Sequence, residues 1–90
     1  MTKEHDCVVL TQDVAEEGLE KGDVGTVVHI HKGGMAYEVE FMTLTGRTVA
    51  VVTLAAKQVR PIASHDLSHV RPLSEPTAAS VRERPAKYGR

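Results

Sequence analysis

The stretch that decides the fold is Leu19-Glu20-Lys21-Gly22-Asp23-Val24-Gly25-Thr26-Val27-Val28-His29-Ile30-His31-Lys32-Gly33-Gly34. A Gly-Asp turn leads into a run rich in β-branched residues, which favour strands. A Gly-Gly pair ends the run and can supply the positive φ angles that a tight hairpin needs. The stretch therefore predicts the central strand of a small antiparallel barrel. Its predicted core residues are Val24, Val27 or Val28, and Ile30.

Gly25 is the irregular position of this strand. Glycine weakens a strand interior, so it predicts either a bulge or a close approach of another part of the chain. A bulge would shift which residues face inward. The sequence therefore does not decide which side chains of this strand point into the core and which point to solvent.

Four further strands are predicted around this one. The first is the apolar run 7–10, and the clearest is 35–42, where Tyr37, Val39 and Phe41 alternate with small or charged residues. Such alternation predicts one buried and one wet face. The run 48–54 is apolar on both faces, which predicts a central or covered strand. The last strand, 59–62, contains Pro61, which is confined to sheet edges and strand ends.

These elements predict an all-β fold, a small SH3-like barrel of about five antiparallel strands, over residues 1–62. From Ala63 onward prolines recur and the alternation stops. Residues 63–90 are therefore predicted to be a disordered, flexible C-terminal tail, with candidate helical turns at 64–70 and 76–84. Ninety residues allow one domain at most.

Composition limits the classes of protein to which the chain can belong. The sequence has no apolar run long enough to span a bilayer, and the start of the chain lacks the apolar core of a signal peptide, so we expect a cytoplasmic protein. A single cysteine excludes an internal disulfide framework. The net charge of −1 conceals an asymmetry: residues 1–61 carry −3 and residues 62–90 carry +2. An acidic body argues against a general nucleic-acid binder.

Three runs together carry a resemblance to a known family. They are Gly22-Asp23-Val24-Gly25-Thr26-Val27-Val28, Ala36-Tyr37-Glu38-Val39-Glu40-Phe41 and Val49-Ala50-Val51-Val52-Thr53-Leu54. Over about residues 7–62 the chain resembles a small bacterial family that is catalogued only as a domain of unknown function. Its members are short single-domain proteins with SH3-like barrels, and the Gly-Asp-x-Gly-x-Val element is KOW-like. The resemblance supports the fold and implies no activity.

An acidic loop, residues 13–23, is the candidate binding site. Its acids are Asp13, Glu16, Glu17, Glu20 and Asp23, and Lys21 alone opposes them, so the loop carries −4. Val14 and Leu19 are predicted to fix the loop to the core, with one helical turn ended by Gly18. The loop is either a solvated segment that keeps a small protein soluble or an electrostatic patch for a protein with a basic surface.

Two histidine pairs and one cysteine are the remaining residues of the sequence with the chemistry for a metal site or a nucleophile. His29 and His31 lie two apart on a strand and share a face, which makes them weak candidates for a metal site without an evident third ligand. His65 and His69 would share a face only on a helix, and incidental spacing is the better interpretation. Cys7 is expected to be a partly buried structural cysteine. We predict no catalytic residue and no cofactor.

Three functional hypotheses follow. The first is a non-enzymatic protein-interaction module or accessory subunit, of the antitoxin or immunity type, that binds a protein with a basic surface. The second is an RNA- or ribosome-associated KOW-like barrel, disfavoured because Tyr37 and Phe41 are expected to point inward, whereas RNA recognition uses exposed aromatics and basic grooves. The third is an accessory component of a metal-dependent enzyme that uses His29 and His31. No membrane partner is expected, and the oligomeric state is left open.

Overall fold

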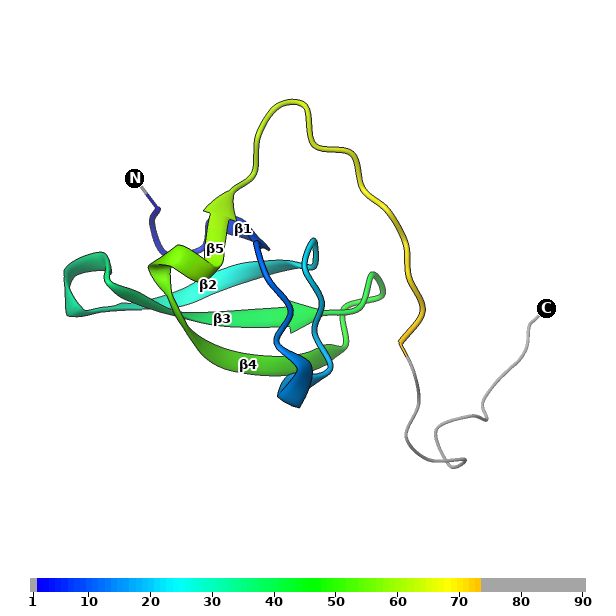
Figure 1. Ribbon diagram of the computed structural model, residues 1–90, viewed down its shortest axis with the longest axis horizontal. Coiled ribbons are helices and arrows are strands. Elements are labelled where there is room, and N and C mark those ends of the chain that lie inside the picture. Colours follow the sequence, from blue (N-terminus) through cyan, green and yellow to red (C-terminus); the bar gives the residue numbers. More distant parts are fainter. Residues whose placement is uncertain (1, 74–90) are drawn as a thin grey trace.

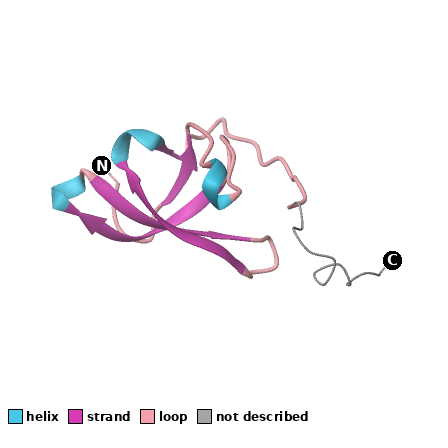
Figure 2. Cartoon of the chain, turned by 60° about the horizontal axis from the view of Figure 1, so that its bottom comes forward, coloured by secondary structure: helices cyan, strands magenta, loops and turns pink. Residues whose placement is uncertain are grey.

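The computed structural model describes residues 2–73, and its regular structure is built from strands (Figure 1). The strands are β1 (Cys7–Leu10), β2 (Val24–His31), β3 (Ala36–Met42), β4 (Thr48–Ala55) and β5 (Val59–Pro61). Three helical turns of 3-10 type, η1 (Ala15–Glu17), η2 (Lys32–Gly34) and η3 (Ala56–Gln58), lie in the connections between strands (Figure 2). The predicted all-β fold of five antiparallel strands is confirmed. Within residues 2–73, no helix is both long and apolar enough to cross a membrane.

The five strands form one sheet in the order β4-β3-β2-β1-β5, and all neighbours are antiparallel. In the part of the chain described here the sheet is open, with β4 and β5 as its edges. The prediction that residues 48–54 form a central or covered strand was therefore wrong. The strand is apolar on both faces although only β3 pairs with it, and Val51 remains 55% exposed.

The core lies on the inner face of the sheet, and its register follows the alternation in β3. Tyr37, Val39 and Phe41 are buried, as predicted, while Glu38 and Glu40 point to the other face. There the glutamates accept hydrogen bonds from hydroxyls of β4: Thr53 Oγ1 lies 2.8 Å from Glu38 and Thr48 Oγ1 2.6 Å from Glu40. The core cluster consists of Val8, Leu10, Val14, Leu19, Val27, Tyr37, Val39, Phe41, Leu54 and Val59.

Gly25 in β2 is a point of close approach, one of the two predicted alternatives. A Cβ atom at this position would lie 2.5 Å from Val39 Cγ1 and 2.8 Å from Phe41 Cε2. Atoms do not approach one another so closely without displacement, so the packing of β3 against β2 requires glycine here. Val27 is fully buried as predicted, but Val24 is half exposed, so its assignment to the core was wrong.

The bulge in β2 lies at Val28, three residues beyond Gly25. Val27 pairs with Val39 and His29 with Glu38, so Val28 has no partner in β3. The inserted residue reverses the alternation, which places Ile30 against the core and His29 on the outer face beside Glu38. The turn that follows contains positive φ at Gly33 and Gly34, as predicted, but it is a 3-10 turn over Lys32–Gly34 rather than a two-residue hairpin.

Beyond β5 the chain arches away from the sheet and runs down beside it as a segment without strands or helices, residues 62–73, which we call the strap (Figure 1). It contains a turn at Ser64 and His65 and no helix, so the candidate helical turn at 64–70 was wrong. The other candidate, at 76–84, lies outside the described residues. The boundary between a barrel of residues 1–62 and a flexible tail of residues 63–90 stays a prediction.

Candidate binding site in the acidic loop

The acidic loop is held to the core by the two apolar residues that the sequence indicates. Val14 and Leu19 are both buried, and their backbones exchange two hydrogen bonds of 2.9 and 3.1 Å. Between them, η1 forms the predicted helical turn, and Gly18 ends it with φ of 71°. With this apolar pair buried, four of the five acids, Asp13, Glu16, Glu17 and Glu20, are exposed, and Asp23 is half-buried.

Two aspartates fix the shape of the loop by accepting backbone hydrogen bonds. Asp13 Oδ1 accepts from the backbone N–H of Lys21 at 2.8 Å, and Asp23 Oδ2 accepts from that of Glu20, also at 2.8 Å. The loop is joined to β1 as well, since Gly22 N–H donates to the carbonyl of Leu10. These contacts make the loop an ordered platform for its carboxylates.

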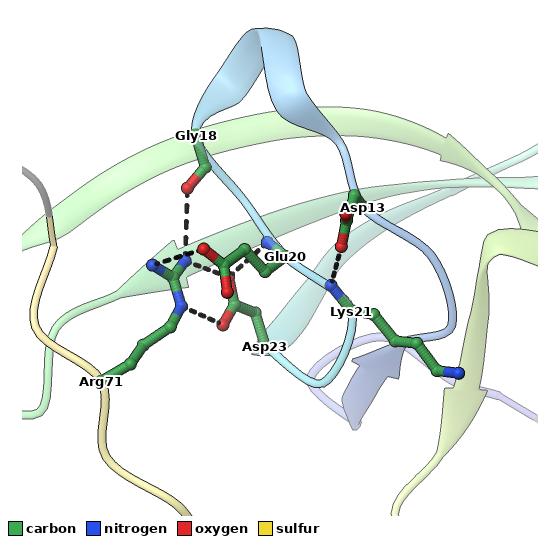
Figure 3. Close-up of polar contacts among 6 residues, drawn as sticks. All are labelled: Asp13, Gly18, Glu20, Lys21, Asp23 and Arg71. Carbon is green, nitrogen blue, oxygen red and sulfur yellow. Dashed lines mark hydrogen bonds and ion pairs between the residues drawn. The ribbon is translucent and has the colours of Figure 1, made fainter.

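Arg71 of the strap lies among these carboxylates (Figure 3). Its Nε donates to Asp23 Oδ1 at 2.9 Å, and its Nη2 donates to Asp23 Oδ2 at 2.6 Å. The same Nη2 lies 3.2 Å from the carbonyl oxygen of Gly18, and Nη1 lies 3.6 Å from Glu20 Oε2. Both Asp23 oxygens are therefore engaged side-on by one guanidinium, which is the strong bidentate geometry of arginine–carboxylate pairs.

The electrostatics of Asp23 reflect this contact. Burial raises the pKa of the Asp23 carboxyl, but hydrogen bonds from Arg71 and from the Glu20 backbone, together with the charge of Arg71, outweigh it. The net effect is a pKa below its ordinary value. The side chain of Asp23 is 19% exposed and that of Arg71 27% exposed, so the pair is better shielded from water than an ordinary surface ion pair. Asp23 is thus held as the carboxylate that a cation requires.

An open depression of about 700 Å³ adjoins the ion pair. Its lining combines acids with apolar groups: Asp13, Ala15, Glu16, Glu17, Gly18, Leu19, Glu20, Arg71 and Leu73. Glu16 and Glu17 are exposed on η1, and within residues 2–73 their side-chain carboxylates make no hydrogen bond or ion pair. The depression can therefore accept further positive charge beside the guanidinium already present.

The five predicted acids are brought together in one region, but with different roles. Asp23 and Glu20 face Arg71, Asp13 stabilises the loop, and Glu16 and Glu17 line the open side. Sequence reasoning missed Arg71. The available signal was the charge asymmetry, because a body of −3 followed by a tail of +2 favours contact between the two.

Comparison with known proteins agrees with the resemblance of the sequence. Residues 4–61 match the family described as "Domain of unknown function (DUF4926)". The chain belongs to this family. The match spans β1 to β5 and contains the whole acidic loop, whereas Arg71 lies beyond it. No curated protein and no solved structure matches the chain.

In this DUF4926 member, His29 and His31 do share a face. Their rings lie 4.5 Å apart, edge to face, and each is near a glutamate: His29 Nδ1 is 3.6 Å from Glu4 Oε2, and His31 Nε2 is 3.7 Å from Glu38 Oε2. Nowhere in residues 2–73 do three or more histidine, cysteine or acidic side chains form a group suited to a metal ion. The histidine pair therefore stays a weak candidate.

The other residues that the sequence singled out, one cysteine, a second histidine pair and two aromatic side chains, do not belong to the acidic loop. Cys7 is exposed at the start of β1, so the prediction of partial burial was wrong; the buried positions of this strand begin at Val8. His65 and His69 lie in the strap without a helix to align them. Tyr37 and Phe41 are buried, so neither offers a stacking surface for a base.

Proposed function

We propose that the protein is a non-enzymatic interaction module whose acidic loop binds a protein with a basic surface. The observation that carries this proposal is the guanidinium of Arg71 between Asp23 and Glu20, contributed by a segment 48 residues away from Asp23. A loop that already accommodates one cation in an ordered set of acceptors has the chemistry to accommodate the cation of a partner.

Two further features support the proposal. The acids of the loop are presented by a rigid sheet, and binding residues are often found on loops positioned by such scaffolds. Glu16 and Glu17 are exposed beside the ion pair, where they add negative potential without a partner among the described residues. Complementary charge of this kind acts mainly on association rate and specificity.

The RNA-binding alternative gains no comparable support. The loop is acidic, and the two aromatic side chains of β3 are buried. The metal-dependent alternative depends on His29 and His31, whose acidic neighbours among residues 2–73 are Glu4 and Glu38. The protein-interaction module is therefore the function that the geometry supports best, and its antitoxin or immunity form stays a prediction from the sequence.

The test is capture of partners from the native cell by the tagged full-length protein. We expect capture to weaken when Glu16→Lys and Glu17→Lys are introduced together, because the reversed charges repel a basic surface. Capture should also fall as the salt concentration rises from about 0.05 to about 0.5 M, where the screening length falls from about 14 Å to about 4 Å.

The matched control reverses two acids elsewhere, Glu4→Lys with Glu38→Lys, and changes the net charge equally. This variant should retain capture, since its substitutions lie beside the histidine pair. Nuclease treatment of the lysate separates protein partners from RNA. If capture is unchanged both by the charge reversal in the loop and by the higher salt concentration, the proposal is wrong. If nuclease treatment abolishes capture, the RNA-associated alternative is favoured.

A further inference from the structure

The acceptors around Arg71 have a geometry that distinguishes arginine from lysine. Asp23 uses one oxygen for Nε and the other for Nη2, while the Gly18 carbonyl accepts from Nη2 as well. Three acceptors are thus met by two nitrogen atoms in a fixed plane. A lysine ammonium is a single point donor on a flexible stem and cannot span both oxygens in this way.

The segment that carries Arg71 is otherwise weakly held. Residues 63–70 are all exposed, and of residues 71–73 two, Arg71 and Leu73, are half-buried. Nearer to β5, the strap is fixed by Arg60, whose guanidinium donates to both oxygens of Asp66 at 2.8 and 2.9 Å. Leu73 lines the depression beside the loop, and in the part of the chain that is described all hydrogen bonds and ion pairs between the strap and the acidic loop come from Arg71. An equivalent side chain of another molecule can replace it in these bonds.

We propose that the acidic loop is an arginine-reading site and that Arg71 is its intramolecular occupant, which an arginine of the basic partner displaces. The inference rests on the proposed function and specifies its ligand and its regulation. In the displacement one guanidinium replaces another: that of the partner binds the carboxylate of Asp23 and the carbonyl oxygen of Gly18, and the strap is released. An occupant tethered to the same chain competes at high effective concentration and lowers the apparent affinity for the partner.

The experiment uses the full-length protein and a capped synthetic peptide with the sequence of residues 68–73, Ser-His-Val-Arg-Pro-Leu. Binding is followed by NMR through the amide signals of Gly18 and Asp23. We expect the Arg71→Ala variant to bind the peptide at least about tenfold more tightly than the unmodified protein, because its site is vacant. A peptide with lysine in place of arginine should bind the same variant about tenfold more weakly.

Two control variants keep the result interpretable. Adding Asp23→Asn to Arg71→Ala should abolish binding, but it also weakens the bond from the Glu20 backbone. Glu20→Gln therefore serves as a second loop variant that leaves Asp23 intact and should reduce binding only in part. Amide spectra that retain the signals of β2 and β3 verify the fold in each case.

The outcomes separate the inference from the proposed function. Equal affinity of the unmodified protein and Arg71→Ala would show that Arg71 does not occupy the ligand site. Equal affinity for the arginine and lysine peptides would show recognition of charge alone, and absence of binding to Arg71→Ala would overturn the inference outright. None of these results affects the salt and charge-reversal test, which decides the proposed function.

Discussion

Gly25 illustrates how one residue can constrain a small core. A methyl group at this position meets Val39 and Phe41, both of which are buried against it. We expect Gly25→Ala to lower the free energy of unfolding by about 1–3 kcal/mol, the usual cost of overpacking. Chemical denaturation measures the change.

The control for this substitution is Thr26→Ala, next to it on β2 and only partly buried. It should cost less than about 1 kcal/mol, since it creates no steric overlap. Equal losses in the two variants would mean that β2 responds to strand propensity rather than to the contact at Gly25.

Asp23 gives a second prediction at the scale of one residue, concerning pH. Its pKa is lower in the folded protein than in the unfolded chain, so its contribution to stability is fully present above the ordinary pKa of about 3.8. That contribution is lost as the pH falls through the lowered value, when the protonated carboxyl ceases to pair with Arg71. We therefore expect the Nε–H signal of Arg71 in NMR spectra to keep its position from neutral pH to about pH 4 and to move toward that of a free arginine in stronger acid.

A separate ion pair in the strap provides the comparison. Hydrogen bonds from Arg60 and from the Ala63 backbone lower the pKa of Asp66 to about 2. The Arg60 signal should therefore persist until about pH 2. An Arg71 signal that moved already between pH 7 and pH 5 would contradict the assignment of its partner as Asp23.

At the scale of elements, β3 determines the register of the sheet. Phe41 is 3% exposed and pairs across both neighbours, with Gly25 on β2 and Ala50 on β4. Phe41→Ala should cost about 3–5 kcal/mol, which a domain of this size cannot easily tolerate. Glu38→Ala and Glu40→Ala each remove one exposed hydrogen bond to a threonine and should cost under about 1 kcal/mol. Thermal unfolding compares the stability of the three variants. If the glutamate variants lose more stability than Phe41→Ala, the glutamates and not Phe41 face the core, and the register described here is wrong.

The strands were predictable where local pattern determines structure. The alternation in β3 identified Tyr37, Val39 and Phe41 as core residues, and Val14 and Leu19 stood out as the apolar positions of an otherwise polar loop. The wrong predictions concern features that depend on which strands pair with one another. The composition of residues 48–54 is that of a covered strand, but whether a strand has one neighbour or two depends on the topology of the whole sheet.

The acidic loop shows the same division between local and distant information. Its charges and the two residues that fix it to the core could be predicted from the sequence of residues 13–23. The bulge at Val28 was expected nearer Gly25, because the sequence shows which residue permits irregularity and not which residue loses its partner. Arg71 was missed because ion pairs between segments 48 residues apart leave no periodic signal in the sequence.

At the scale of the whole molecule, residues 2–73 form a sheet with an acidic loop and a strap that returns to that loop. All core residues lie between Val8 and Val59, so the strap adds no side chain to the core cluster. Within residues 2–73, its ion pairs with the rest of the fold are those of Arg71 and the exposed Arg60–Asp66 pair. A partly exposed pair such as Arg71–Asp23 is usually worth up to about 1 kcal/mol. The strap is therefore better suited to control access to the loop than to maintain the fold.

The last prediction follows from this division. A chain that ends at Ser64 should fold, and its thermal midpoint should fall by no more than about 8 °C, the shift that 1 kcal/mol produces in a domain of this size. Arg71→Ala combined with Asp66→Asn in the full-length protein should reproduce the same decrease, because shortening removes the partners of two ion pairs, Arg71–Asp23 and Arg60–Asp66. Differential scanning calorimetry compares the two proteins with the unmodified chain. A much larger decrease on shortening than on substitution would mean that other residues beyond Ser64 stabilise the sheet, and Arg71 would then be one contact of a packed segment rather than the main link between a releasable strap and the acidic loop.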